Sequence, residues 1–430
     1  MKIKIPKLVT RVGTFTFFNI LNAAIPFLLL PILTNFLSPS DYGIIDLFNN
    51  AGFILAPVIG FSITKAIDRY YFEQEEIKLK LFISTTVLSH FKYGVLFIIF
   101  ALIITFAFKA IFISFDLPVN LLFYSFVYAF LSQTSEIILI LWRVTYKTIH
   151  YGVFRVFKTF LDLGISIFLI VNLNYGWEGR ILPQLLIAFI FAGVSIFYLR
   201  KEGYFVNLQT DKRYKKIALK FSTPLIFHSM SGFLIGFSDR FFIFFLLDLK
   251  NLGVYSVAYQ IGMVLSLFQN SFNQAWTPYF YETLKKGVNK DKLKIVKITY
   301  IYYLLLIFMV LFFYFATPLI YKFVIGKQFK SGIEVVGWVL LGYAFNGMYK
   351  MMVNYLFYLK ETKRIALFTL ITALTNGILN YFLIKSRGIE GAAIATTLSF
   401  LLLFIIVLIY SRKKYPMPWN LKLNYEKTNK

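Results

Sequence analysis

The chain has 430 residues, of which 58% are hydrophobic and only 15% are charged. A soluble protein of this size could not bury so much apolar surface, so the composition excludes a soluble globular domain and favours lipid as the solvent. The net charge of +25 lies in short segments between apolar runs, which argues against a nucleic-acid partner. The absence of cysteine excludes disulfide bonds, thiolate catalysis and cysteine metal sites.

Twelve apolar stretches follow one another along the chain, each long enough to cross a bilayer. They cover residues 13–36, 43–66, 83–108, 119–142, 153–173, 180–200, 219–247, 252–275, 298–321, 333–358, 364–384 and 390–411. The first stretch follows three lysines, as in a signal peptide, but it is too long for one and no small-residue cleavage site follows it. We therefore expect an uncleaved first helix and an all-α polytopic bundle of about twelve transmembrane helices.

Lysine and arginine alternate between rich and sparse loops, which fixes an expected orientation through the positive-inside rule. The rich segments are residues 65–80, 200–220, 285–297 and 412–430. The opposite set is sparse, and its first loop, Leu37 to Tyr42, contains no basic residue. This bias predicts an even number of helices with both termini in the cytoplasm.

Two short motifs recur at nearly the same spacing. Residues 176–179 (GWEG) and 388–391 (GIEG) are 212 positions apart, and Gly43 and Gly253, which open the second and eighth stretches, are 210 apart. The repeat predicts two six-helix lobes in the same orientation around a central cavity, a plan typical of transporters. The expected division is an N-terminal lobe at 1–200, a cytoplasmic linker at 201–218, a C-terminal lobe at 219–411 and a basic tail at 412–430.

Charged residues inside the predicted helices are candidate functional groups, because each costs about 2.5–3.5 kcal/mol at the centre of a bilayer. Asp239 and Arg240 lie deep in the seventh helix. Either Arg240 grips anionic oxygens of a substrate while Asp239 orients it or takes a coupling ion, or the two residues belong to a structural salt bridge.

A second group of charges lies in the fourth and fifth predicted helices. Lys158 shares a helical face with its charged neighbours, and Glu136 lies at a similar depth, so the two could form a neutralising pair. The alternative is a basic inner vestibule that includes Arg143 and Arg155. Several asparagines could bind polar groups of a substrate, although helix–helix hydrogen bonds would explain them equally well.

The resulting candidates fall into two sets. The substrate-binding set is Arg240, Asp239, Asn270, Asn273, Asn19 and Asn49, and the cavity or coupling charges are Asp46, Arg143, Arg155, Lys158, Asp162 and Glu136. The three histidines are scattered, so we expect no catalytic residue, no metal site and no cofactor.

Five motifs occur in the order in which polysaccharide flippases carry them. They are residues 37–43 (LSPSDYG), 69–73 (RYYFE), 238–242 (SDRFF), 252–259 (LGVYSVAY) and 388–393 (GIEGAA). The chain therefore resembles the Wzx-type flippases of the multidrug/oligosaccharidyl-lipid/polysaccharide exporter superfamily.

The resemblance implies a transporter rather than an enzyme, in the bacterial inner membrane. Such a flippase turns over undecaprenyl-diphosphate-linked oligosaccharide by alternating access, for the O-antigen of lipopolysaccharide, for capsule or for a related surface glycan. The expected partners are this lipid-linked oligosaccharide, membrane lipids and polysaccharide polymerase machinery, with no nucleic acid. The sequence has no GxxxxGK[ST] phosphate loop, so an ion gradient is the expected energy source.

Three alternatives stay open at this point. A cation-coupled exporter of small molecules would share the two-lobe plan, but the LSPSDYG and SDRFF motifs argue against it. A membrane enzyme of glycan assembly, such as a polymerase, would usually carry a large outer loop, which this sequence lacks. A scaffold without transport activity is the third.

Overall fold

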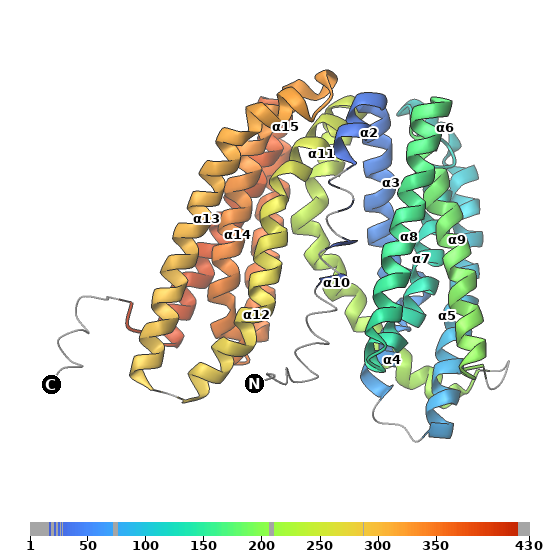
Figure 1. Ribbon diagram of the computed structural model, residues 1–430, viewed down its shortest axis with the longest axis horizontal. Helices are drawn as coiled ribbons and strands as arrows, with labels where there is room; N and C mark the ends of the chain where they lie inside the picture. Colours follow the sequence, from blue (N-terminus) through green and yellow to red (C-terminus); the bar gives the residue numbers. More distant parts are fainter. Residues whose placement is uncertain are drawn as a thin grey trace, which may run out of the picture. The chain divides into compact units, whose positions relative to one another are not determined.

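The computed structural model describes residues 17–18, 21–22, 25, 27, 29–71, 76–205, 210–286 and 288–419. These residues form helices and contain no strand, which confirms the predicted all-α fold. The chain divides into two compact units, Met1–Phe233 and Leu234–Lys430. Each unit is a bundle of helices, coloured from blue to green and from yellow to red in Figure 1.

Unit 1 contains the first ten helical segments that the structure describes and most of the next. They are α2 (Leu30–Phe36), α3 (Pro39–Val58), η1 (Ile59–Ser62), α4 (Lys65–Tyr70), α5 (Glu76–Ala107), α6 (Lys109–Ser114), α7 (Leu121–Val144), α8 (Thr148–Ile167), η3 (Phe168–Asn172), α9 (Glu178–Lys201) and the first two thirds of α10 (Lys212–Leu246). Unit 2 contains the end of α10 and α11 (Leu249–Gly262), α12 (Val264–Lys286), α13 (Asn289–Phe323), η4 (Lys327–Gly332), α14 (Ile333–Tyr358) and α15 (Thr362–Lys414).

Six helices in the described part of the chain are long and apolar enough to cross a membrane, and the pair α11 and α12, bent by 40°, is a seventh candidate. The six are Pro39–Ser62, Leu79–Ala107, Leu121–Val144, Glu178–Lys201, Lys290–Phe323 and Thr362–Lys414. The chain is thus a transmembrane helix bundle. Helices α8 and α14, with 20 and 26 residues, are also long enough, but their charged and amide side chains make them too polar for this group.

Three predicted helices differ from the observed ones, one because its backbone breaks and two because they are joined. The predicted helix 43–66 is interrupted after α3, where Gly60, Phe61 and Ser62 all have positive φ angles. The predicted helices 364–384 and 390–411 are joined within α15 by a kink at Gly388, whose φ of 59° suits glycine, instead of by a loop. Ten of the 24 residues of the predicted first helix, 13–36, lie outside the described residues, and α2 forms its C-terminal part.

The first turns of α10 belong to unit 1 because their apolar face packs there. Ala218 is buried with Ile63, Ala66 and Phe82, and the ring of Tyr214 lies 5.7 Å from that of Phe82. The boundary between the compact units therefore falls inside α10, after the basic segment 201–218 that the sequence marked as a linker.

The LSPSDYG motif forms a capped helix start. The Ser38 hydroxyl accepts a hydrogen bond from the Asp41 amide at 3.1 Å, while the Asp41 carboxylate accepts one from the Ser38 amide at 3.1 Å. This capping box satisfies two otherwise unpaired amides of α3. Asp41 also accepts from the Trp177 amide at 3.1 Å, and a Cβ on Gly176 would lie only 2.7 Å from that carboxylate. The motif therefore ties the start of α3 to the start of α9.

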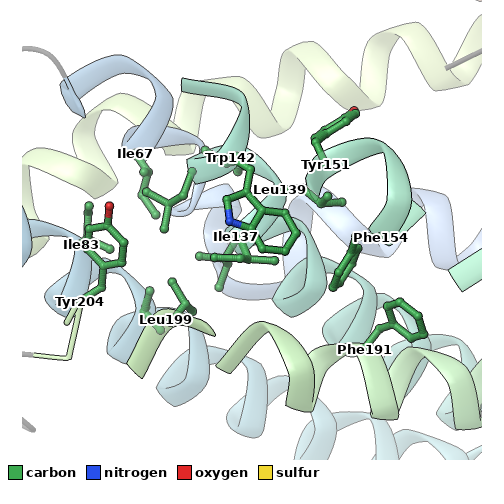
Figure 2. Close-up of a cluster of buried hydrophobic side chains, with 14 of the residues drawn as sticks. Ile67, Ile83, Ile137, Leu139, Trp142, Tyr151, Phe154, Phe191, Leu199 and Tyr204 are labelled. Atoms are coloured by element: carbon green, nitrogen blue, oxygen red, sulfur yellow. The ribbon is translucent and has the colours of Figure 1, made fainter. Parts of the chain in front are cut away.

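A buried cluster around Trp142 holds the helices of unit 1 together. Figure 2 shows the indole of Trp142 between Ile67 on one side and the rings of Phe154 and Phe191 on the other. The ring centres of Trp142 and Phe154 are 5.6 Å apart, and those of Phe154 and Phe191 are 4.8 Å apart. Burial of each such side chain contributes about 1.5–3 kcal/mol. The cluster fixes α7 and α8, which carry most of the charged candidates of this unit.

Candidate functional site

A charged cavity of about 630 Å³ opens in unit 1 between α4, α7 and α10. Its walls are Thr64, Lys65, Asp68, Arg69, Ser132, Gln133, Glu136, Ile140, Arg143, Phe221 and Leu225. Three of these side chains are cations and two are carboxylates. This combination is suited to an anionic ligand rather than to an apolar one.

The backbone break after α3 positions the α4 side of the cavity. The Ser62 hydroxyl donates to the Pro57 carbonyl at 2.7 Å, and a Cβ on Gly60 would lie 2.6 Å from Nδ1 of the buried His90. After the break, Lys65 and Arg69 lie one helical turn apart on α4 and share a face. The break therefore sets the direction in which these two cations point.

Arg143 is paired with Asp68 across the cavity. The guanidinium donates a hydrogen bond to the Asp68 carboxylate, and the two side chains are 44% and 38% exposed. An ion pair this accessible contributes at most about 1 kcal/mol, so it opens at little cost. Arg143 can therefore exchange Asp68 for another anion.

Glu136 lines the same cavity and does not form the predicted pair with Lys158. Within the described residues, the Glu136 carboxylate has no hydrogen-bond or ion-pair partner. Arg155, which the sequence also placed nearby, donates to the Tyr151 hydroxyl at 2.8 Å. Neither Arg155 nor Lys158 lines the cavity, although both act electrostatically on Glu136. Of the two residues expected in the basic vestibule, Arg143 lines the cavity and Arg155 does not. Glu136 is a further wall residue.

Asp162, a predicted coupling charge, is held by Arg180, the first residue of the predicted helix 180–200. Arg180 donates to both carboxylate oxygens of Asp162, at 2.8 and 3.1 Å, and to the Ser166 hydroxyl at 2.9 Å. The two charged side chains are only 17% and 12% exposed. This bidentate pair joins α8 to α9, so Asp162 has a structural role in holding the two helices together.

The candidates on α3 lie near α9. The Asn49 amide oxygen accepts from the Gln184 side chain at 3.3 Å, as the helix–helix alternative expected. The Asp46 side chain is partly buried, and its backbone carbonyl accepts from Asn50 at 2.7 Å. Asn19 lies outside the described residues.

Asp239 and Arg240 are paired inside unit 2. Their side chains are 1% and 5% exposed, and Nη1 of Arg240 donates to Oδ1 of Asp239 at 3.0 Å. The Arg240 amide donates to the same oxygen at 2.9 Å, and the Tyr255 hydroxyl donates to the other oxygen. The guanidinium carbon lies 4.3 Å from the ring centre of Tyr259.

This network continues from α11 into α14. The Tyr343 hydroxyl donates to that of Tyr259 at 3.2 Å, and Gln269 donates to the Tyr343 carbonyl at 2.6 Å. The pair is thus enclosed by aromatic rings within one unit, which is the geometry of the structural salt bridge that the sequence left as an alternative.

Ser238, the first residue of the SDRFF motif, contributes to the packing of unit 2. The Ser238 hydroxyl and the Asn380 amide both donate to the Asn376 oxygen at 3.0 Å, and Asn376 donates to Ser399 at 3.2 Å. Ser399 and both asparagines are fully buried. Sequence analysis missed this cluster, although asparagines at 376 and 380 share a helical face.

Asn270 and Asn273 lie on α12 beside a cation that sequence analysis missed. Nζ of Lys350 donates to the Asn270 oxygen at 2.8 Å, and the Asn354 amide donates to the Asn273 oxygen at 3.2 Å. The rule that selects charged residues inside predicted helices would have identified Lys350, which lies within the predicted helix 333–358. Across the described residues, no three His, Asp or Glu side chains come close enough to hold a metal ion.

Comparison with known proteins finds related sequences. The model of a family described as "Polysaccharide biosynthesis protein" matches residues 8–284. An uncharacterized membrane protein of Haemophilus influenzae is 25% identical over 357 residues, which cover 80% of this chain and 82% of that protein. A protein of the Lsg locus of the same organism is 24% identical over 355 residues, with the same coverage of both chains.

Solved structures share the fold. An inward-facing multidrug resistance MATE family transporter superposes with a TM-score of 0.66 at 14% identity, covering 94% of this chain and 97% of that one. The lipid II flippase MurJ, in an inward closed conformation, superposes with a TM-score of 0.67 at 16% identity, covering 94% and 87%. At these identities the likeness concerns the fold alone.

Proposed function

The chain belongs to the polysaccharide biosynthesis protein family, whose model matches well over half of it, and on this basis we propose that it is a flippase for a lipid-linked oligosaccharide. We propose undecaprenyl-diphosphate-linked oligosaccharide as the substrate, carried across the bacterial inner membrane for O-antigen, capsule or another surface polysaccharide. The shared fold with a protein named lipid II flippase supports a lipid-linked substrate. Transport needs no bond-forming chemistry, so the proposal assigns no enzymatic activity.

The observation that carries this proposal is the charged cavity of unit 1. A diphosphate head group loses its hydration when it leaves water, and fixed cations in a low-dielectric cavity offset part of that loss. Lys65, Arg69 and Arg143 provide three such cations on two helices. The guanidinium groups add fork-shaped donors that match phosphate oxygens.

The carboxylates of the same cavity make the binding reversible. Three cations and two carboxylates leave a formal net charge of only +1, since Asp68 and Glu136 offset two of the positive charges. Asp68 forms an ion pair with Arg143. We propose that a phosphate displaces Asp68 on entry and that Asp68 recaptures Arg143 on release, so the head group is not trapped.

An ion gradient is the energy source that we propose. Asp162 is bound to Arg180, and Asp41 is bound within the LSPSDYG capping box. Glu136, which lines the cavity, is therefore the better candidate for a coupling charge in unit 1. Collapse of the proton or sodium gradient with a selective ionophore would identify the ion.

A cation-coupled exporter of small molecules is the second candidate function. The fold shared with a multidrug resistance transporter favours it. The family match and the charged walls of the unit 1 cavity favour the saccharide substrate instead.

The proposed function is tested by replacing Arg143 with alanine in cells whose surface glycan depends on this protein. We expect normal abundance of the variant in the membrane, loss of surface glycan and accumulation of lipid-linked precursor on the cytoplasmic side. Arg143→Lys should keep partial function because the charge survives. Arg200→Ala, an exposed change at the end of α9 outside the cavity, is the matched control. Normal glycan display by Arg143→Ala would contradict the proposal.

A further inference from the structure

Lys350 places a positive charge in a helix long enough to cross the membrane. Helix α14 has 26 residues and is therefore about 39 Å long, against about 30 Å for the hydrocarbon core. Lys350 lies eight residues before Tyr358, the last residue of α14, or about 12 Å from that end. A charge at such a depth is expensive and marks a cavity or a partner of opposite charge.

No carboxylate supplies that partner in the part of unit 2 that the structure describes. The hydrogen bond from Nζ of Lys350 goes to the neutral amide oxygen of Asn270 at 2.8 Å. Among the described residues, no ion pair involves Lys350. Among the described residues, the ammonium of Lys350 is therefore hydrogen-bonded to a neutral amide and not to a carboxylate.

The surroundings of Lys350 form a polar grid on two neighbouring helices. Asn270 and Asn273 are three residues apart on α12, and Lys350 and Asn354 are four apart on α14, so each pair shares a helical face. Asn354 is buried and holds Asn273 at 3.2 Å. Asn270 is exposed, and Lys350 is partly exposed. The grid thus has a fixed inner side and an accessible outer side.

We propose that Lys350, with Asn270 and Asn273, binds a carboxylate-bearing monosaccharide in the glycan of the substrate, and thereby sets a preference for acidic over neutral glycans. The transport consequence rests on the proposed function, whereas the binding site itself does not. Amide groups donate to and accept from sugar hydroxyls, and the single ammonium neutralises a single carboxylate.

A diphosphate is a poorer match for this grid. Lysine is a point charge without the fork of donors that grips phosphate oxygens, and its neighbours here are neutral. Two phosphates would place more negative charge beside Lys350 than one ammonium can offset. The cavity of unit 1, with three cations, has the composition that a diphosphate requires.

The test measures binding of two synthetic probes to the purified protein in lipid nanodiscs. Both probes are polyprenyl-diphosphate disaccharides, one ending in glucuronate and the other in glucose, so they differ only in the acidic group. We expect the wild type to bind the glucuronate probe about tenfold more tightly, which corresponds to about 1.4 kcal/mol. Lys350→Gln should abolish this preference and leave the glucose probe within twofold, while Lys350→Arg should retain most of it.

Two further variants keep the result interpretable. Lys350→Met preserves the length of the side chain without its charge, so it should fold if Lys350→Gln does not. Lys363→Gln removes an exposed lysine at the start of α15 and should leave both affinities unchanged. Equal binding of the probes by the wild type, or equal weakening of both by Lys350→Gln and Lys350→Met, would overturn the inference.

A transport measurement with the same probes separates this inference from the proposed function. If the wild type prefers the glucuronate probe through Lys350 but moves neither probe across the bilayer, the binding site stands and the flippase function fails. If it moves both probes at equal rates and with equal affinities, the function stands and the site at Lys350 fails.

Discussion

Asp239 and Arg240 are adjacent residues whose side chains nevertheless pair, because the Arg240 guanidinium folds back to the Asp239 carboxylate and lies on the Tyr259 ring. Removal of one member of a buried pair leaves the other charge uncompensated, at a cost of about 3–5 kcal/mol. Arg240→Ala is therefore expected to lower the amount of folded protein in the membrane. Membrane abundance and size-exclusion profiles of a fluorescent fusion measure this effect.

The paired replacement Asp239→Leu with Arg240→Leu is the informative control. It removes both charges, so it should recover abundance relative to Arg240→Ala. A stable, abundant Arg240→Ala protein that fails to support glycan display would assign Arg240 to the substrate and contradict the structural role.

The second prediction concerns the effect of the Glu136 charge on the affinity of the unit 1 cavity for an anion. Glu136→Gln raises the net charge of the cavity from +1 to +2, because one of its two carboxylates is lost. At about 8 Å and an effective dielectric constant of about 20–80, this change favours an anion by about 0.5–2 kcal/mol. We expect tighter binding of a polyprenyl-diphosphate probe in nanodiscs and slower release.

The control for this change is Glu202→Gln, which removes a carboxylate paired with Lys147 outside the cavity. It should leave the affinity of the probe unchanged. If Glu136→Gln also left the affinity unchanged, the cavity would not be where the diphosphate binds.

At the level of elements, the break between α3 and α4 depends on a glycine. Gly60 has a φ of 68°, and a Cβ at this position would lie 2.6 Å from Nδ1 of His90. Gly60→Ala is therefore expected to destabilise the protein by about 1–3 kcal/mol through backbone strain and the steric clash. A thermal melt of the purified protein measures the loss, which the double variant with His90→Ala should reduce.

Helix α8 supplies the matched control for this substitution. A Cβ on Gly164 would have no side chain and no other part of the chain within 4 Å, apart from its own neighbours and helix backbone, and this backbone is helical. Gly164→Ala should be neutral or should stabilise the helix by up to about 1 kcal/mol. Equal melting temperatures for Gly60→Ala and Gly164→Ala would show that the break does not require glycine.

Sequence patterns predicted the helices well, but not their breaks or their partners. Apolar runs mark spanning helices because burial in lipid depends on composition alone. The break at Gly60 packs against His90, thirty residues away, and the Asp162–Arg180 pair joins two helices. Neither contact could be read from the spacing of residues in the sequence. Long-range side-chain partners of this kind are set by tertiary packing, which no local pattern records.

The candidate site shows the same division. The rule that intramembrane charges are candidates selected Glu136 and Arg143, and both line the unit 1 cavity. The cations of α4 were counted only as part of a basic loop, because their position in a cavity follows from the backbone break. Lys350 was missed although the same rule applied to it.

For the whole molecule, the charge bias predicts the orientation in the membrane. Reporter fusions placed within residues 206–209, before α10, should be active only in the cytoplasm. Fusions within residues 37–42, before and at the start of α3, should be active only outside. The measurement uses a paired phosphatase and fluorescent-protein reporter, and an external signal from the segment before α10 would contradict the predicted orientation.

The most direct test of the account is translocation by the purified protein in sealed vesicles. Undecaprenyl-diphosphate oligosaccharide is placed in one leaflet, an ion gradient is imposed, and exposure of the glycan in the other leaflet is followed with a membrane-impermeant glycosidase. We predict gradient-dependent exposure with the wild type and with Arg200→Ala, and little with Arg143→Ala. If folded wild-type protein exposed no more glycan than protein-free vesicles did, the proposed flippase function would be wrong.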